Sequence, residues 1–495
     1  NHHLFFADLA IRESGMAELL PSVRVVIFDE AHQLNETGIQ FLGQQLATGQ
    51  LLDLARDLLA AGLQQARGLC DWSAIAGELE VAARQLRMEA GQVRGSARLR
   101  WNGTAPDGID PDTWQASLQR LHQALMGAAA ALATVSELAP DFVRLQQRAA
   151  QLAALTQRFG QPCEVALVRW ADVSQSLRLV ESPLDIAQAM RERVLAEPEP
   201  PQPPESAAEG GHAAAGARPR AWVFVSATLG DDAGLRWFTE PCGLDRAEVL
   251  RVGSPFDYAA QAALYVPTRI ARPSDAAHSG DVARLAGEAA ARLGGRTMVL
   301  TTTLRALRNI GEALAQRFEA APAEGGDRIE VLVQGNLPKR VLMARFRAGN
   351  AAGRGGCVLV ASASFWEGVD MPGDVLQLVV IDKLPFPPPG DPLVEARCRR
   401  LEAEGRSPFA DYSVPEAAIA LKQGAGRLIR RESDRGLLVI CDSRLVQMGY
   451  GRRLLAALPP MRRLADAPAF DAALQALRSA NEGASTVPED DDLPY

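Results

Sequence analysis

The feature that most constrains this chain is a short apolar run that ends in two carboxylates and a histidine, Val25-Val26-Ile27-Phe28-Asp29-Glu30-Ala31-His32. β-Branched and aromatic residues in a run of this length predict a buried parallel strand. Because α/β proteins bind nucleotides at the carboxyl ends of such strands, we expect the acidic pair to lie at a nucleotide site.

The two acids have the chemistry that phosphoryl transfer to water requires. Asp29 is expected to hold Mg²⁺ through water, and Glu30 to orient and deprotonate the attacking water. His32 is expected to sense the γ-phosphate and to relay its loss. A strand followed by an acidic pair is common by chance, so the rest of the chain must decide whether this is an ATPase.

Length and cysteine usage set outer limits. The 495 residues suffice for about three domains. The chain begins at Asn1 rather than Met, and we expect an upstream part to be missing. It contains no signal-peptide pattern and no apolar run near the length of a membrane span, which predicts a cytoplasmic protein. The six cysteines show no CxxC spacing, which argues against a zinc or iron–sulfur site in this sequence.

The net charge of −8 is divided unevenly. From Asp245 to Arg463 the chain carries 31 Lys and Arg against 24 Asp and Glu, a balance of +7, whereas the remainder carries −15. The basic half also holds most of the motifs described below. We therefore expect nucleic acid to bind there, weakly and with a dependence on salt.

Hydrophobic periodicity divides the chain further. Leucines at helical spacing predict an all-helical segment at 37–160, inserted after the first strand. Residues 197–219 begin with five prolines in eight positions and predict a disordered linker. A second buried strand, Trp222–Val225, ends in Ser226-Ala227-Thr228. After Asp245, strands alternate with helices, which predicts a second parallel-sheet domain.

Two more polar motifs occur in the second half. Ser364-Phe365-Trp366-Glu367-Gly368-Val369-Asp370 follows a strand, and its glycine permits close backbone approach while Asp370 can bond a ribose hydroxyl or an arginine. Gln423-Gly424-Ala425-Gly426-Arg427-Leu428-Ile429-Arg430 predicts two arginines on one helical face, with Gly426 letting that helix approach a neighbour. Two guanidinium groups suit a triphosphate, as arginine fingers do. A solvated arginine face is the alternative interpretation.

Taken in order, these four motifs resemble motifs II, III, V and VI of superfamily 2 helicases. More narrowly, the chain resembles the XPD-like branch of the bacterial DinG and YoaA type. The narrower features are Asn1-His2-His3-Leu4, Ser226-Ala227-Thr228-Leu229, Ser254-Pro255-Phe256 and the segment from Ile381 to Pro392.

The resemblance implies an α/β fold with two RecA-like parallel-sheet motor domains and an all-helical, Arch-like insertion in the first. Its expected divisions are 1–36 and 161–245 for the first motor domain, 37–160 for the insertion, 246–463 for the second motor domain and 464–495 for a C-terminal tail. ATP then binds between the motor domains, and single-stranded DNA crosses both. The implied activity is an ATP-dependent 5′ to 3′ DNA helicase of repair or replication, acting as a monomer.

The resemblance also implies roles for individual residues. Catalysis falls to Asp29, Glu30, His32, Arg427 and Arg430, and Mg²⁺ to Asp29. ATP binding and coupling fall to Ser226, Ala227, Thr228, Gly368, Asp370, Gln423 and Gly426. DNA contacts fall to Trp366 and to Thr301, Thr302 and Thr303, because hydroxyl groups bind backbone phosphate without reading sequence.

The chain departs from the family pattern in two respects. It contains no G-x-x-x-x-G-K-[ST] phosphate loop, and the family's four iron–sulfur cysteines also lie ahead of motif II. We therefore expect the 4Fe-4S cluster only in the missing upstream segment and little ATP hydrolysis by this chain alone. A nucleic-acid-binding or partner-docking module without a motor is the alternative function. A nuclease-type motor is disfavoured by the segment Pro385–Pro392.

The C-terminal residues Asp490-Asp491-Asp492-Leu493-Pro494-Tyr495 form an unusual end. By composition they predict a disordered acidic tail that aids solubility. They also resemble the acidic tail of bacterial single-stranded DNA-binding protein, which ends in an apolar residue, Pro and Phe. Tyr495 would then fill a pocket on a replication or repair protein, and a clamp-loader accessory subunit is one candidate.

Overall fold

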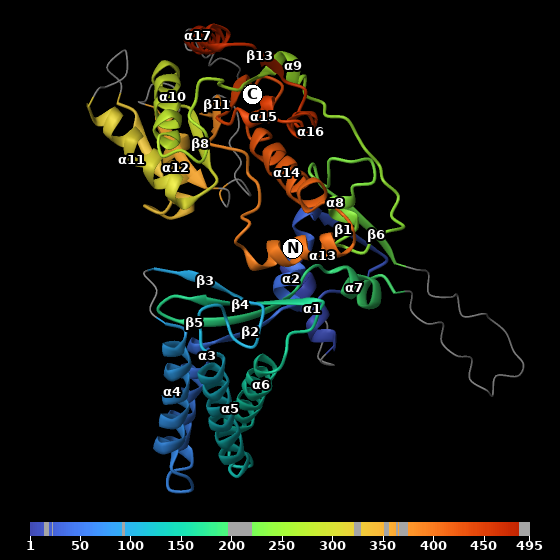
Figure 1. The fold of residues 1–495 in the computed structure, drawn as a ribbon, viewed down its shortest axis with the longest axis vertical. Coiled ribbons are helices and arrows are strands. Elements are labelled where there is room, and N and C mark those ends of the chain that lie inside the picture. Colours follow the sequence, from blue (N-terminus) through green and yellow to red (C-terminus); the bar gives the residue numbers. More distant parts are fainter. Residues whose placement is uncertain are drawn as a thin grey trace, which may run out of the picture. The chain divides into compact units, whose positions relative to one another are not determined.

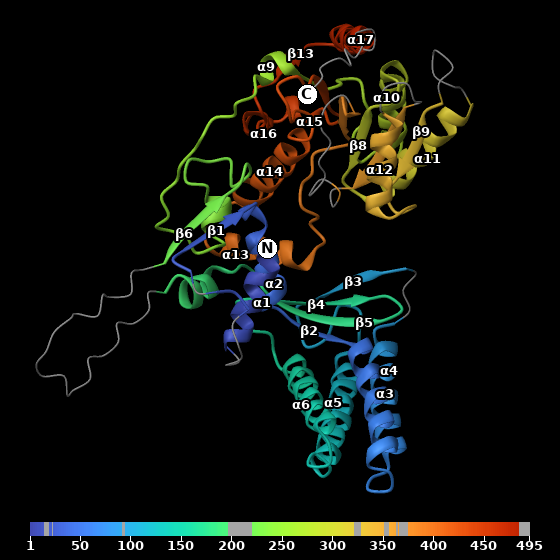
Figure 2. The same cartoon turned by 180° about the vertical axis from the view of Figure 1, so that it is seen from behind.

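The computed structural model describes residues 1–13, 19–21, 23–91, 95–196, 220–320, 328–350, 356–362, 365 and 375–484. The chain divides into two compact units, each of which is built from separate stretches of sequence (Figures 1 and 2). Unit 1 comprises Asn1–Ala227, Phe238–Ala247 and Pro388–Arg406, and unit 2 comprises Thr228–Trp237, Glu248–Pro387 and Ser407–Tyr495. No helix within the described ranges is long and apolar enough to cross a membrane.

Unit 2 is built on a parallel sheet of seven described strands in the order β13-β7-β12-β11-β8-β10-β9. The strands are β7 (Ala262–Tyr265), β8 (Thr297–Thr301), β9 (Glu330–Val333), β10 (Cys357–Ser362), β11 (Leu378–Ile381), β12 (Gly436–Ile440) and β13 (Arg462–Leu464). All the pairings among these described strands are parallel. The expected second parallel-sheet domain is therefore present.

Helices cover both faces of this sheet, as parallel strands require. Strand β11 shows that both faces are covered. Val379 and Ile381 belong to the hydrophobic cluster on one face, whereas Leu378 and Val380 belong to the cluster on the other. The first face carries α12 (Lys339–Gly349), α14 (Val414–Ala425), α15 (Arg444–Gln447) and α16 (Gly451–Ala457). The second carries α10 (His278–Leu293), α11 (Leu304–Ala320) and α17 (Ala467–Ala484).

Helix α17 corrects the expected C-terminal boundary. We expected a tail from residue 464, but Phe470 stacks on Tyr265 with ring centroids 4.6 Å apart, and Leu474 is buried. The apolar face of α17 therefore belongs to the core of unit 2. The acidic end from 485 onward lies outside the described residues, as do the linker 197–219 and the motif V residues Trp366, Gly368 and Asp370.

Unit 1 contains the strand that carries the acidic pair. β1 (Val25–Asp29) pairs in parallel with β6 (Ala221–Val225), which places Asp29 beside Val225. On one face, Phe28 stacks on Phe224 with ring centroids 5.3 Å apart, and Phe5 of α1 (His2–Glu13) meets Phe28 edge-on. The opposite face bears the exposed apolar side chains Val25, Ile27, Val223 and Val225.

The inserted segment is mostly helical, as expected, but it also contributes two strands. A four-stranded antiparallel sheet has the order β2-β5-β4-β3. Its strands are β2 (Gln44–Ala47), β3 (Ala97–Trp101), β4 (Leu167–Val173) and β5 (Leu177–Pro183). Because β2 and β3 pair with strands beyond residue 160, this sheet crosses the boundary that the sequence suggested.

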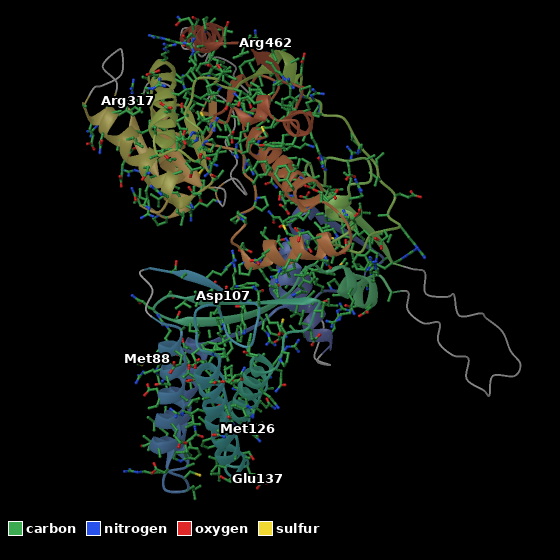
Figure 3. The ribbon with its side chains drawn as sticks, viewed as in Figure 1. Met88, Asp107, Met126, Glu137, Arg317 and Arg462 are labelled. Carbon is green, nitrogen blue, oxygen red and sulfur yellow. The ribbon has the colours of Figure 1, made fainter. Side chains whose placement is uncertain are left out.

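A bundle of four long helices packs on one face of the antiparallel sheet (Figure 1). These are α3 (Thr48–Gln65), α4 (Trp72–Glu89), α5 (Pro111–Ala133) and α6 (Pro140–Gly160). Trp72 and Trp114 lie in its core, whereas Met88 and Met126 lie on its outer surface (Figure 3). The leucine stripes of this segment are thus its own core.

The other face of the sheet receives α13 (Pro392–Ala403), a helix from the second half of the sequence. Leu393 and Ala396 pack against a small cluster that includes Val168 and Leu184. Arg397 donates through Nε to the Leu184 carbonyl and pairs with Glu36 at 2.9 Å. We expected 246–463 to form one domain, but these contacts place Pro388–Arg406 in unit 1.

Candidate nucleotide site

The carboxyl ends of β1 and β6 bring motif II and motif III together. Asp29 ends β1 and lies beside Val225, so that Glu30 and Ser226 are the residues directly after neighbouring parallel strands. Glu30 has φ 50° and ψ 43°, the left-handed conformation. A residue other than glycine in this conformation costs about 1–3 kcal/mol, and such strain is typical of functional sites.

Glu30, Ser226 and His32 form a hydrogen-bonded cluster. The Ser226 hydroxyl lies 3.3 Å from Glu30 Oε2 and 2.9 Å from His32 Nδ1. His32 Nδ1 is also 3.3 Å from the same carboxylate oxygen. Ser226 has one hydroxyl proton. When it donates this proton to Glu30, it can accept from His32 in the tautomer that carries the proton on Nδ1.

Burial differs across this cluster in a way that suits catalysis. The side chain of His32 retains 9% of its accessible surface, whereas that of Glu30 retains 62%. The histidine is thus held within the protein and the carboxylate is open to a ligand. Both Ser226 and His32 contact Oε2, so that Oε1 takes part in neither contact.

Asp29 is exposed at the end of β1. Its Oδ1 accepts the Glu30 backbone N–H at 3.0 Å, and its backbone carbonyl accepts from His2 Nε2 at 2.9 Å. Burial lowers the pKa of His2, and its hydrogen bond to Asp29 opposes that shift. The Asn1-His2-His3-Leu4 segment therefore supports the strand end that carries the acids.

The residues present fit a magnesium ion held mainly by water and phosphate. Mg²⁺ prefers oxygen ligands and usually retains several waters, so one or two carboxylates are sufficient. The exposed Asp29 carboxylate is a donor of this kind. Within the described ranges, no three His, Cys, Asp or Glu side chains gather in a group that could hold a metal.

Motif VI differs from the helical arrangement that we expected. Helix α14 ends at Ala425, so Gln423 lies in its last turn while Arg427 and Arg430 lie in the loop that follows. The two arginines therefore do not share a helical face. A Cβ at Gly426 would lie 3.2 Å from the Lys422 carbonyl, so that, among the residues that the structure describes, this glycine fits against its own helix.

The loop after α14 is fixed by its apolar residues. Leu428 and Ile429 are buried in the core of unit 2, with Arg427 on one side of them in sequence and Arg430 on the other. Arg427 is half-buried and Arg430 is exposed. Gly436 at the start of β12 is required here, because a Cβ would lie 2.9 Å from the Gln377 backbone carbonyl as well as 2.4 Å from the Leu428 side chain.

The three threonines of motif IV differ in what they offer to a ligand. Thr301 is fully buried and donates its hydroxyl to the Ala361 carbonyl, which leaves it no surface for DNA. Thr302 directs its backbone N–H and its hydroxyl to Asp382. Thr303 is exposed, and its oxygen accepts the Ala306 N–H while its own proton remains to be donated. Thr303 is thus the best placed to bind phosphate.

Motif III continues beyond Ser226 in two different environments. Ala227 is exposed and ends the first stretch of unit 1, whereas Thr228 is buried and begins the first stretch of unit 2.

Comparison with known proteins identifies the family. The helicase C-terminal domain model matches residues 287–461. ATP-dependent DNA helicase YoaA of Escherichia coli K12 is 35% identical over 472 residues, which cover 94% of this chain and 67% of the relative. The chain belongs to the YoaA and DinG family of helicases. ATP-dependent helicase DinG of Mycobacterium tuberculosis H37Rv is 38% identical over 233 residues, which cover 47% of this chain and 33% of that protein.

The fold agrees with this assignment. The structure of S. tokodaii Xpd4 superposes with a TM-score of 0.55 at 13% sequence identity and covers 94% of this chain and 81% of that chain. The expected resemblance to DinG and YoaA helicases and the RecA-like α/β class are therefore confirmed.

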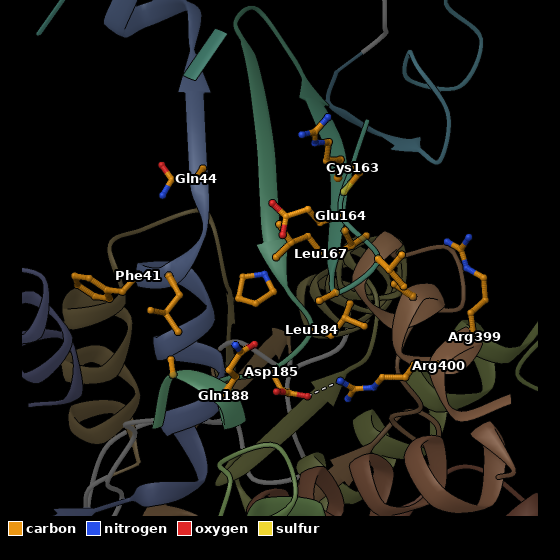
Figure 4. A pocket seen from close by; sticks show the side chains of 18 of the residues that line it. Phe41, Gln44, Cys163, Glu164, Leu167, Leu184, Asp185, Gln188, Arg399 and Arg400 are labelled. Atoms are coloured by element: carbon orange, nitrogen blue, oxygen red, sulfur yellow. Dashed lines mark hydrogen bonds and ion pairs between the residues drawn. The ribbon is translucent and has the colours of Figure 1, made fainter. Parts of the chain in front are cut away.

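Unit 1 of this helicase-family chain also has a groove of about 1180 Å³ that the sequence did not predict. Its wall combines apolar side chains such as Phe41 and Leu184 with Arg399 and with an ion pair between Asp185 and Arg400 at 2.5 Å (Figure 4). Six separate stretches of sequence line the groove. No local pattern connects them, which explains why sequence analysis missed the groove.

The cysteines are dispersed in the folded chain. Cys242, Cys357 and Cys441 are buried, and the remaining three are half-buried. Burial raises the pKa of Cys357 to about 11.

Proposed function

We propose that this chain forms the motor of an ATP-dependent 5′ to 3′ DNA helicase that acts in DNA repair or replication. The observation that carries the proposal is the contact of Glu30 and His32 with Ser226 across two neighbouring strand ends. A carboxylate beside a phosphate site suits water activation, and its link to a second strand suits coupling of hydrolysis to motion. Membership of the family supports the same activity.

Glu30 is the general base of this proposal. Its Oε2 receives the Ser226 hydroxyl and faces His32, which fixes the orientation of the carboxylate. Oε1 is then the oxygen that orients and deprotonates the attacking water. Mg²⁺, held by Asp29 through water, would neutralise phosphate charge when bound.

Ser226 is the coupling residue. It lies directly after β6 and contacts both Glu30 and His32, which lie after β1. A change at the γ-phosphate that moves either side chain therefore alters the hydrogen bonds of Ser226. Through that hydroxyl, the loss of phosphate is communicated to motif III.

The remaining assignments concern residues of unit 2. Arg427 and Arg430 neutralise the charge that develops on the transferred phosphoryl group. Thr303, at the start of α11, donates its hydroxyl to a DNA backbone phosphate, because phosphate oxygens accept hydrogen bonds. The protein acts as a cytoplasmic monomer on single-stranded and forked DNA.

An unwinding assay tests the activity and its polarity. A chimera would supply in cis the third of the E. coli relative that lies outside the match. Forked duplexes and duplexes with a 5′ or a 3′ single-stranded tail serve as substrates, with ATP and Mg²⁺. We expect unwinding of the 5′-tailed and forked duplexes and none of the 3′-tailed duplex. Unwinding of the 3′-tailed duplex alone would overturn the polarity.

One observation favours a second candidate function. The sequence contains no G-x-x-x-x-G-K-[ST] loop, so that the chain could serve as a nucleic-acid-binding or partner-docking module. A chimera that binds single strands but hydrolyses no ATP would support this candidate over the helicase.

The acidic C-terminal end is proposed to bind a replication or repair protein, such as a clamp-loader accessory subunit. Its aspartates precede Leu493, Pro494 and Tyr495, which suits a pocket with a basic rim. Fluorescence anisotropy of a labelled 484–495 peptide tests this interaction. Binding that Tyr495→Ala abolishes supports the proposal, whereas equal binding by both peptides or by neither leaves only a solvated tail.

A further inference from the structure

The loop that carries Arg430 is held by a buried carboxylate. Asp434 retains 3% of its accessible surface. Its Oδ2 accepts the backbone N–H of Arg430 at 2.7 Å and that of Arg431 at 2.8 Å. The Asp434 N–H in turn donates to the Arg431 carbonyl at 3.1 Å, which closes the loop on itself. The carboxylate thus fixes the backbone at the residue whose side chain points outward.

A buried amide holds the same loop from a distant part of the sequence. Gln261 is the last residue of α9 (Tyr258–Gln261) and retains 5% of its accessible surface. Its Nε2 lies 2.9 Å from the carbonyls of Arg431 and Glu432 and 3.4 Å from that of Asp434. The amide of one side chain therefore lies within hydrogen-bonding distance of three backbone carbonyl oxygens of the loop.

The two side chains hold opposite kinds of backbone group in the loop. Asp434 can only accept and binds N–H groups, whereas Gln261 presents its NH₂ to carbonyl groups. Leu428 and Ile429 secure the preceding part of the loop in the core. The position of the Arg430 backbone is therefore set from both sides, although its side chain is exposed.

We propose that Asp434 and Gln261 are positioning residues for Arg430 in the transfer of the phosphoryl group. This inference rests on the proposed function, in which Arg430 stabilises the transferred phosphoryl. It also gives a role to the Ser254-Pro255-Phe256 segment. That segment leads into α9, which Asp257 caps by accepting the Ala260 N–H, and α9 ends at Gln261.

Hydrogen exchange on the chain itself tests the positioning. Asp434→Ala is expected to remove the protection of the Arg430 and Arg431 amides, and Asp434→Asn to retain most of it, because asparagine keeps one acceptor oxygen. Asp471→Ala is the matched control, since Asp471 is an exposed aspartate of the same unit that pairs with Arg292. It should leave both amides unchanged.

Steady-state kinetics of the chimera test the consequence. Asp434→Ala is expected to lower kcat for ATP by roughly 10²-fold with KM nearly unchanged, the cost of a misplaced catalytic group. Asp434→Asn should restore most of kcat. Gln261→Glu, which turns a carboxylate toward three carbonyl oxygens, should lower kcat as Asp434→Ala does.

The outcomes separate the two proposals. If Arg430→Ala leaves kcat unchanged, the role of Arg430 in the proposed function fails. If Arg430→Ala lowers kcat but Asp434→Ala and Gln261→Glu do not, the positioning inference is overturned. It is overturned as well if the variants lower only the melting temperature, or if Asp434→Asn loses kcat while both amides stay protected. If Asp434→Ala does not fold, the same measurements of hydrogen exchange and kcat on Asp434→Asn and Gln261→Glu test the inference.

Discussion

Ser226 Oγ lies 2.9 Å from His32 Nδ1, although 194 residues separate the two in the sequence. The helical insertion and its antiparallel sheet occupy most of that interval. The contact arises because β1 and β6 are parallel neighbours, so that both residues follow strand ends at the same edge. Motifs II and III are therefore one hydrogen-bonded unit in this protein.

Glu30→Gln in the chimera should abolish ATP turnover while leaving the binding of ATP and DNA largely intact. The amide keeps the shape of the side chain but cannot accept the proton of the attacking water. Turnover is measured by phosphate release and binding by anisotropy, with Glu36→Gln on the neighbouring helix as a control. A hydrolysis rate within about tenfold of that of the unmodified chimera would contradict the assignment of Glu30 as the general base.

Arg427→Ala should lower kcat for ATP by roughly 10³-fold, the order expected of an arginine finger. Arg427 lies in the loop after α14, where the buried Leu428 holds its backbone. The measurement is steady-state hydrolysis with saturating single-stranded DNA. Arg292→Ala is the control, since Arg292 is an exposed arginine of the same unit that pairs with Asp471. An effect confined to DNA affinity would mean that Arg427 belongs to a phosphate-binding surface for DNA.

The chain by itself should show no DNA-stimulated ATPase, because it has no phosphate-loop sequence. It should still bind single-stranded DNA weakly through its basic half, with affinity falling steeply between about 50 and 200 mM salt as counterion release predicts. Anisotropy of a labelled oligonucleotide across this range measures the slope. An affinity that does not change with salt would contradict electrostatic binding.

Much of the site followed from the sequence because strand ends are local features. The apolar run before Asp29 and the run before Ser226 each predict a strand, and parallel pairing then brings Glu30, His32 and Ser226 together. The roles assigned to these residues remain predictions. The sequence pattern did not predict where α14 ends. Gly426 and Arg427 continue the helical spacing in the sequence, but the helix of the folded chain ends at Ala425.

The fold shows the same contrast. Alternating strands and helices after Asp245 predicted the parallel sheet of unit 2, whereas β2 and β3 were hidden in a segment of leucine-rich helices. The local periodicity of a segment does not indicate which strand it pairs with in a sheet. For that reason β4 and β5 were expected in the first motor domain, although they pair with strands of the insertion.

We expect Asp382 to make the stability of unit 2 sensitive to pH. It is buried between β11 and motif IV, and it accepts the backbone N–H of Lys383 at 2.8 Å and that of Thr302 at 3.0 Å. Burial raises its pKa from 3.8 to about 6, and the nearby charge of Lys383 and the two N–H donors oppose the shift only in part. The folded state therefore binds this proton more tightly than the unfolded state does.

The direction of the pH dependence follows from the linkage between proton binding and folding. Between about pH 4 and pH 6 the folded protein holds more protons at this site, so its contribution to stability falls as pH rises, by up to roughly 3 kcal/mol. Asp382→Asn removes the titration. Relative to the unmodified chain, the variant should gain stability from about pH 4 to pH 6 and show a constant difference once the pH is well above 6. Urea unfolding, followed by pulsed hydrogen exchange in β11, measures this difference. A difference that is the same at every pH, or that matches the exposed control Asp471→Asn, would show that Asp382 does not titrate in this range.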